Sequence, residues 1–181
     1  MLRITIPAGE SYDSVNNLFI PEKEKSLTLE HSLVSLSKWE SKWHKPFLSR
    51  ENNKTPEEIL DYIRCMTLTQ NVDPKDYYRL GDEQIKQIKE YIDAPMTATT
   101  FSDDKKKGGR KTTITAEIIY YWMISLNIPF ECQKWHLNRL FTLIKVCNIK
   151  NSPPKKMSKS ELASRNRNLN AARRRALRTK G

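Results

Sequence analysis

The last 31 residues of this chain differ so sharply from the rest that they limit how the whole chain can fold. Residues 151–181 carry ten basic side chains and one acid, whereas the first 150 residues carry 22 basic and 20 acidic side chains. The helix predicted in this tail, ending at Arg178, has only three large apolar residues, Leu162, Leu169 and Leu177. So little apolar surface cannot form a core, so the chain must divide into a self-sufficient body and a cationic arm.

A proline-containing segment marks the division. Pro153 and Pro154 exclude helix there, and Ser158-Lys159-Ser160-Glu161 then matches a helix-capping box. The 150 residues before it are enough for one domain that buries roughly two-thirds of its unfolded surface. We therefore predict three segments: an N-terminal β ribbon with its connection over 1–31, a helical core over 32–150, and a linker with a basic C-terminal helix over 151–181.

The N-terminal segment shows the two-residue period of short strands. Ile4 and Ile6 alternate with polar residues up to Pro7, and Leu27 and Leu29 alternate in the same way. The two strands are predicted to pair as an antiparallel ribbon, with residues 8–24 as the connection. An isolated pair of strands is marginal in water, so the ribbon must pack against the helices that follow.

From Ser32 the apolar period changes to three and four residues. Leu33, Leu36, Trp39 and Trp43 form one face of a helix that ends before Pro46. Thr55-Pro56-Glu57-Glu58 is a strong signal for the start of a second helix. Further helices are predicted from Gly81 to Ile92, from Ile114 to Ile128 and from Trp135 to Cys147, with a mobile loop at Lys105–Lys111.

The segment Ile114–Ile128 is the most apolar in the chain, and it is predicted to be the central buried helix. A buried strand is the alternative, because Ile, Tyr and Trp also favour sheets. With the helix that follows Pro129, it is expected to form an antiparallel hairpin. The fold class is therefore mainly α: a compact domain of about five or six helices, a short N-terminal β ribbon and a basic C-terminal helix.

The sequence contains no pattern typical of an enzyme. It lacks a phosphate-binding glycine loop, a nucleophile elbow and a His-Glu-x-x-His run. Cys132 and His136 have a spacing that places two metal ligands on one helix face, but the rest of a zinc site is missing. We predict no catalytic residue, no cofactor and no metal site, and structural or surface roles for the three histidines and three cysteines: His31, His44, His136, Cys65, Cys132 and Cys147.

Two sets of residues are candidates for binding a macromolecule. Trp39 and Trp43 lie one helical turn apart, which is typical of a core but also of a protein-docking anchor when the rings are exposed. The tail presents guanidinium groups suited to phosphate oxygens or to an acidic protein surface; a solvated tail that keeps the protein soluble is the alternative. The arginines of this second set are Arg165, Arg167, Arg173, Arg174, Arg175 and Arg178.

Three stretches of the chain resemble a family of small proteins encoded among the virion assembly genes of tailed bacteriophages. They are Ser35–Leu48 (SLSKWESKWHKPFL), Tyr91–Phe101 (YIDAPMTATTF) and the long stretch Tyr120–Lys159, which begins YYWMISLNIPFECQKWHLNRLF. The resemblance covers most of the chain from Leu29 onward. It brings no catalytic residues with it.

The resemblance implies a tail assembly chaperone, which keeps the long tape-measure protein soluble while tail tube subunits polymerise around it. The strongly basic tail would also suit a structural virion component or a nucleic-acid-binding protein, so these stay as alternatives. The expected partners are other phage tail or virion proteins, with nucleic acid as a further candidate through the basic tail. The location that the resemblance implies is the host cytoplasm during assembly, or the virion. No apolar run in the sequence is long enough to span a membrane.

Overall fold

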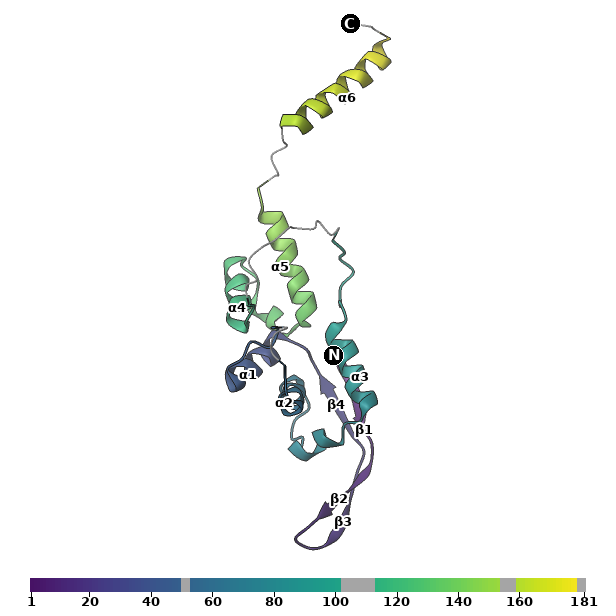
Figure 1. Cartoon of the computed structure of the whole chain (residues 1–181), viewed down its shortest axis with the longest axis vertical. Helices are drawn as coiled ribbons and strands as arrows, with labels where there is room; N and C mark the ends of the chain where they lie inside the picture. The colour runs from purple at the N-terminus through teal and green to yellow at the C-terminus, as the bar shows by residue number, and fades with distance from the viewer. Residues whose placement is uncertain (50–52, 102–112, 154–158, 179–181) are drawn as a thin grey trace. The chain divides into compact units, whose positions relative to one another are not determined.

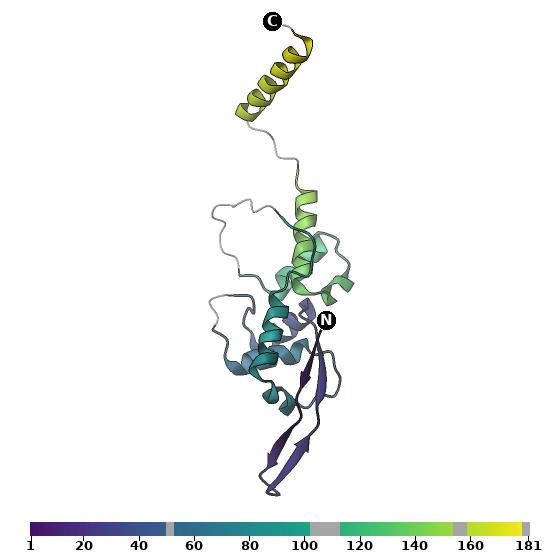
Figure 2. The same ribbon diagram turned by 90° about the vertical axis from the view of Figure 1, so that its right-hand side faces the viewer.

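The structure is a computed structural model that describes residues 1–49, 53–101, 113–153 and 159–178. It forms two compact units, Met1–Asn148 and Ile149–Gly181 (Figures 1 and 2). The prediction of a mainly helical chain with a small β region at the N-terminus is confirmed. The Lys105–Lys111 loop and the Ser158 cap lie outside the described residues.

In chain order the elements are β1 (Leu2–Ile6), β2 (Gly9–Asp13), β3 (Leu18–Glu22), β4 (Lys25–Leu29), α1 (Leu33–Trp43), α2 (Pro56–Met66), the 3-10 helix η1 (Pro74–Arg79), α3 (Asp82–Asp93), α4 (Ala116–Ser125), the 3-10 helix η2 (Phe130–Lys134), α5 (Leu137–Asn151) and α6 (Lys159–Leu177).

Strands β1 and β4 pair antiparallel, as the alternating pattern predicts. Ile4 faces Leu27, and both side chains are buried. Backbone hydrogen bonds attach the ribbon to the helices. In one of them the Glu30 N–H donates to the Met66 carbonyl at the end of α2 over 2.9 Å. Helix α3 also contacts β1. The helical core therefore supplies the support that two isolated strands lack.

The connection predicted over residues 8–24 is itself a hairpin, formed by β2 and β3. It keeps the register of the ribbon, so that Tyr12 faces Phe19 just as Ile4 faces Leu27. Figures 1 and 2 show β2 and β3 continuing from β1 and β4 toward the turn. Asn17 takes a left-handed conformation in the turn and accepts a hydrogen bond from the Tyr12 hydroxyl over 2.7 Å. The sequence pattern predicts a connection here and not a hairpin, because an alternation of apolar and polar residues does not reveal these turn interactions.

The centre of the core is α1. Leu33, Leu36 and Trp39 are fully buried, and α1 contacts α2, α4 and η2. The helix begins as predicted at Ser32, whose side chain caps the Ser35 N–H, and it ends before Pro46 at His44 in the left-handed conformation. The Thr55 cap and the proline at the first position of α2 are likewise as predicted. Local capping chemistry thus determined where these two helices begin.

The most apolar segment is a helix, but the prediction that it is the central buried one is wrong. In α4, Ile119 and Met123 are buried, whereas Tyr121 and Ile124 are 66% and 61% exposed. Helix α4 makes its most extensive contacts with α1 and covers only one side of it. Its other side faces solvent despite its apolar side chains, and this geometry excludes both full burial and the alternative of a buried strand.

The helix predicted from Trp135 begins two residues later, at Leu137. Before it, Cys132 lies in η2 and His136 lies between η2 and α5, so these two residues do not share a helix. His136 instead forms an isolated antiparallel bridge with Ser32, and the Leu137 N–H donates to the His31 carbonyl over 2.7 Å. These long-range backbone contacts stop α5 from extending further toward the N-terminus.

Candidate interaction surfaces

Helix α6 is a cationic rod with no buried residue along its length. The six arginines named above are all exposed; the first five lie in the helix, and Arg178 follows directly after it. Glu161 lies in the first turn and Arg174 and Arg175 lie in the last turn. Charges in these positions stabilise the helix by interacting favourably with its dipole. The charges in its own sequence therefore favour the helical form of α6, although no apolar side of the helix is buried.

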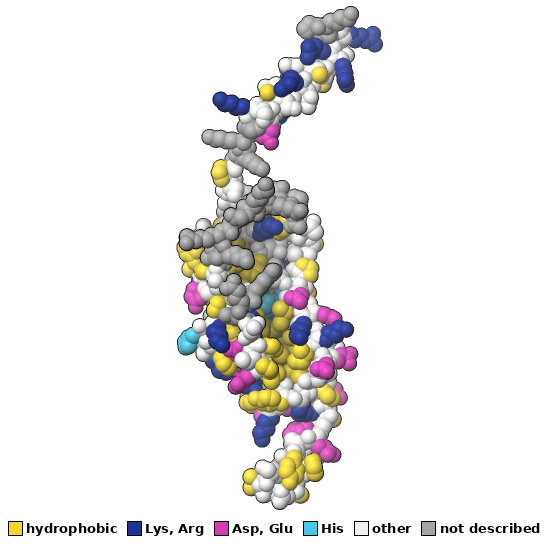
Figure 3. Space-filling model, in the orientation of Figure 1, with side chains coloured by type: hydrophobic (Ala, Val, Ile, Leu, Met, Phe, Trp, Pro, Cys, Tyr) yellow, Lys and Arg dark blue, Asp and Glu magenta, His cyan; other side chains and the backbone are white. Residues whose placement is uncertain are grey.

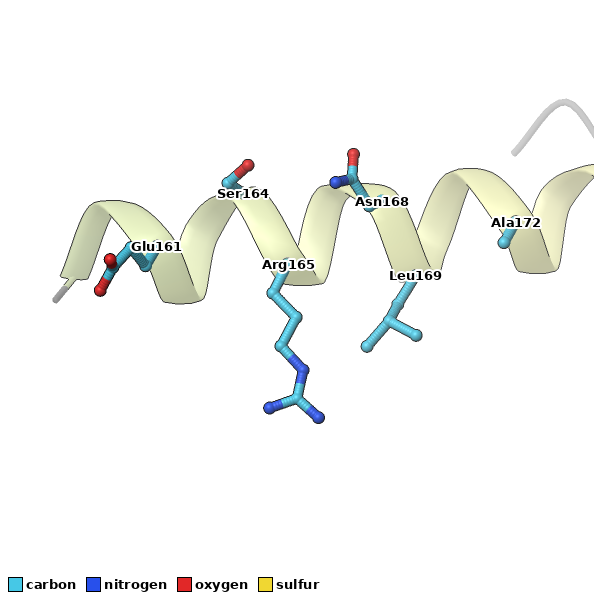
Figure 4. Close-up of a pocket in the computed structure, with 6 residues that line it drawn as sticks. All are labelled: Glu161, Ser164, Arg165, Asn168, Leu169 and Ala172. Carbon is cyan, nitrogen blue, oxygen red and sulfur yellow. The ribbon is translucent and has the colours of Figure 1, made fainter. Parts of the chain in front are cut away.

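One side of α6 combines a leucine with an arginine. Figure 4 shows Arg165 and Leu169 extending from the same side of the helix, away from Ser164 and Asn168. Leu162 lies seven residues before Leu169 and hence falls on nearly the same side. All six residues that line this shallow depression belong to α6, so the depression is a surface of one helix and not an enclosed cavity.

The two tryptophans have different environments. Trp39 is fully buried, its indole N–H donates to the Glu58 carbonyl over 2.8 Å, and its ring meets Phe47 edge-on. Trp43 is half-buried and donates to Asp61 Oδ2 over 2.8 Å. Both rings hold α1 against α2. A partner cannot reach Trp39 in this fold, so the docking role proposed for it gives way to the core role, and only part of the Trp43 ring is accessible.

The histidines His31 and His136 meet in the core. Their rings lie 5.1 Å apart, and the Tyr62 hydroxyl lies 2.6 Å from His31 Nδ1. His136 Nε2 donates to the Tyr91 carbonyl over 2.9 Å. Burial and the neighbouring His136 lower the pKa of His31 to about 3, and burial lowers the pKa of His136 as well. Both imidazoles are therefore neutral near pH 7, and they join the end of the ribbon to α2, α3 and the start of α5.

A buried carboxylate, Glu40, lies beside a small cleft between the end of α1 and the start of α4. Its two oxygens accept hydrogen bonds from the backbone N–H groups of Phe47, over 2.8 Å, and Ala116, over 2.7 Å. Burial raises the pKa of Glu40 despite these bonds. Because both oxygens are already occupied by the backbone, the carboxylate ties α4 to α1 and is not poised as a general base. The sequence does not single Glu40 out, because its partners lie far from it in the chain.

Two exposed apolar surfaces were missed by sequence reasoning. The first is on the β2–β3 hairpin, where Phe19 and Leu18 are 69% and 62% exposed; Figure 3 shows apolar side chains at this end of the first unit. The second is the outer side of α4, at Tyr121 and Ile124; the exposed Phe130 of η2 lies with its ring centroid 6.4 Å from that of Tyr120 in the same helix. Apolar surface of this kind on a protein typically marks a binding site. The signal available in the sequence was the run Leu18-Phe19-Ile20, which breaks the alternation of a half-buried strand.

Comparisons with protein-family models, with curated proteins and with solved structures found no match to this chain. Among the described residues, no helix combines the length and apolarity needed to cross a bilayer. Within the same part of the chain, His, Cys, Asp and Glu side chains do not gather in groups of three or more that would hold a metal ion.

Proposed function

We propose that this protein is a non-enzymatic assembly protein of a tailed bacteriophage that acts as a tail assembly chaperone by binding the tape-measure protein. The observation that carries the proposal is α6, a 19-residue helix that exposes its arginines and leucines and buries none of them. Such a helix gains little from folding alone and has most to gain from a partner. The exposed apolar side of α4 supplies a second surface that would hold an aggregation-prone chain.

The direct test is solubility of the tape-measure protein during co-expression. We expect the wild-type protein to raise the soluble fraction of the tape-measure protein and to co-purify with it. Neutralising three arginines of α6, as Arg167→Gln, Arg173→Gln and Arg174→Gln, should reduce co-purification, because the guanidinium groups are lost while helix propensity is nearly kept. If the tape-measure protein is equally soluble without this protein, the proposal is wrong.

A matched control removes three charges from the body. The variant Lys38→Gln, Lys86→Gln, Lys89→Gln changes exposed lysines of α1 and α3. It has the same loss of net charge as the α6 variant, so it separates the effect of the helix from that of charge alone. We expect it to co-purify as well as the wild type does.

Two further observations distinguish a chaperone from a virion component. Mass spectrometry of purified particles should find no stoichiometric amount of a chaperone, whereas a structural component would be present in every particle. Tail assembly chaperones are also often made in two lengths by ribosomal slippage, and Pro153-Pro154-Lys155-Lys156 can be encoded by runs of C and A that permit it. Non-repetitive codons there, without an overlapping downstream frame, count against the chaperone.

Nucleic-acid binding is the second candidate, and the composition of α6 favours it. Arg165 and Arg167 alternate with Asn166 and Asn168, and Asn170 follows two residues later, which adds amide groups to guanidinium groups on an exposed helix. Binding through such a helix would be steeply salt dependent and nearly independent of base sequence. A mobility shift of duplex DNA at low salt that is lost on removal of residues 158–181 would support it. The absence of any shift at low salt would exclude it.

A further inference from the structure

The β2–β3 hairpin lacks a core side of its own. Tyr12 pairs with Phe19 across the strands, and their rings lie 5.1 Å apart on one face. Leu18 and Ile20 belong to the opposite face, because successive residues of a strand alternate. All four side chains are exposed. Both faces of the hairpin therefore present apolar surface to solvent, which an ordinary surface hairpin avoids.

Among the residues that the structure describes, no strand pairs with either long edge of the hairpin. The sheet that contains it has two strands, so β2 and β3 are each edge strands. Open edges and exposed apolar faces together make a hairpin of this length marginal in water. A partner that covers either face would stabilise it.

The orientation of the hairpin is maintained at its base. The Arg79 guanidinium, at the end of η1, donates hydrogen bonds to the carbonyls of Pro7 and, over 3.4 Å, Lys23. Its Nη1 also lies 3.8 Å from Glu22 Oε2. These contacts bind both strands of the hairpin where it leaves the ribbon, so the apolar end is held in a defined position on the first unit.

The net charge of the hairpin indicates what kind of partner would bind it. Residues 8–24 contain four acids (Glu10, Asp13, Glu22 and Glu24) and one base (Lys23), which is a net charge of −3. Two hairpins brought together would place these like charges side by side, which disfavours pairing of hairpin with hairpin. A partner that covers the apolar faces is therefore favoured if it carries positive charge.

The same chain supplies a surface of that description. Residues 159–178 contain seven basic side chains and one acid, a net charge of +6, with Leu162 and Leu169 on one side of α6. Pairing of α6 with α6 would bring the arginines together and is disfavoured for the same reason as pairing of hairpins. Of the pairings between these two exposed surfaces, only hairpin with α6 unites opposite charges and buries apolar side chains on both sides.

We propose that the β2–β3 hairpin of one copy binds α6 of a second copy of this chain. The contact joins two different surfaces, so each copy still has one free hairpin and one free helix after it forms. Repetition of such a head-to-tail contact builds rings or open chains of molecules. This self-association does not depend on the proposed function, because it involves no other protein.

A charge-exchange experiment on the full chain tests the proposal. The hairpin variant is Glu10→Lys, Glu24→Lys, which changes the net charge of residues 8–24 from −3 to +1. The helix variant is Arg167→Glu, Arg173→Glu, Arg174→Glu, Arg178→Glu, which changes the net charge of residues 159–178 from +6 to −2. All six side chains are exposed. Each variant alone should lose self-association, because its hairpin and its helix then carry charge of the same sign. An equimolar mixture should regain it, because the hairpin of one variant matches the helix of the other.

Analytical ultracentrifugation gives the readout. The wild type should at least double its weight-average mass as concentration rises at low salt, and the increase should shrink as salt is added. The variant Phe19→Thr, Ile20→Thr should lose the increase, since Thr keeps strand propensity while removing apolar surface. The control Glu90→Lys, Asp93→Lys, on the exposed side of α3, should behave like the wild type.

Four results would overturn the proposal. A wild type that stays monomeric at every concentration excludes the contact. Association that persists in both single-surface variants, or that is lost in the α3 control, places it elsewhere. A mixture that stays monomeric shows that opposite charges of the hairpin and the helix do not drive the association. Co-purification of the tape-measure protein is measured separately, so failure here leaves the proposed function standing and the reverse also holds.

Discussion

Acidification should destabilise this protein through the buried histidine pair. His31 has a pKa of about 3 in the folded state against 6.5 in an unfolded chain. The folded state therefore favours the neutral form of His31 over the protonated form. The stabilisation is complete above pH 6.5 and is lost progressively as the pH falls from 6.5 toward 3.

The size of the effect follows from the interval of pH. Between 6.5 and 5 the unfolded state gains a proton at His31 that the folded state refuses, which costs about 2 kcal/mol at about 1.4 kcal/mol per unit. His136 adds to the loss, because its pKa is also lowered by burial. Glu40 acts in the opposite direction, because its raised pKa lets the folded state take up a proton more readily as the pH falls. The loss of about 2 kcal/mol at His31 alone is a large part of the stability of a typical domain.

Urea unfolding at pH 7, 6 and 5, followed by tryptophan fluorescence, measures this directly. The variant His31→Gln keeps a polar group for the Tyr62 hydroxyl but cannot ionise, so its free energy of unfolding should fall by about 2 kcal/mol less than that of the wild type between pH 7 and pH 5. The control His44→Asn changes an exposed histidine at the end of α1 and should keep the wild-type slope. Equal slopes for the wild type and His31→Gln would refute the reasoning.

Three further predictions concern packing and the base of the hairpin. Trp39→Phe should lower the free energy of unfolding in urea by about 3 kcal/mol and Trp43→Phe by about 1 kcal/mol, since only Trp39 is fully buried; equal losses would contradict the burial. Tyr91→Phe removes the donor, 2.7 Å away, from the buried Glu30 carboxylate, and it should cost about 1–2 kcal/mol in the same assay; no change would mean that the bond contributes nothing. Arg79→Ala should speed hydrogen exchange of the amides in β2 and β3 but not in β1 and β4. If exchange in β2 and β3 is the same in the variant as in the wild type, the Arg79 contacts are not needed to hold the hairpin.

The helix starts show how far local sequence can predict this structure. Ser32 and Thr55 begin α1 and α2 because a side-chain oxygen caps an N–H three residues away, and those atoms are close in any chain with that sequence. The pairing of β1 with β4 was also predicted, from alternation in two short segments. The hairpin over 8–24 was missed, because β3 carries apolar residues on both faces and β2 has Tyr12 as its one large apolar residue, so neither strand shows the two-residue period.

Burial was less predictable than secondary structure. Trp39 and Tyr121 are both aromatic residues of helices, yet one is fully enclosed and the other is mostly exposed. The difference arises because α1 is covered by α2, α4 and η2, whereas α4 is covered on one side only. Periodicity identifies the apolar side of a helix, but it does not say how many neighbours that helix will have.

The sequence by itself determined the helix and strand segments with clear caps or periods, and the separation of a nearly neutral body from a cationic α6. These properties depend on residue type and on neighbours a few positions away. Tertiary structure alone decided that α1 is the central helix, that His31 meets His136, and that the β2–β3 hairpin keeps its apolar faces in solvent. The physical reason is that burial and pKa depend on which distant segments come together, and that is a property of the packed chain as a whole.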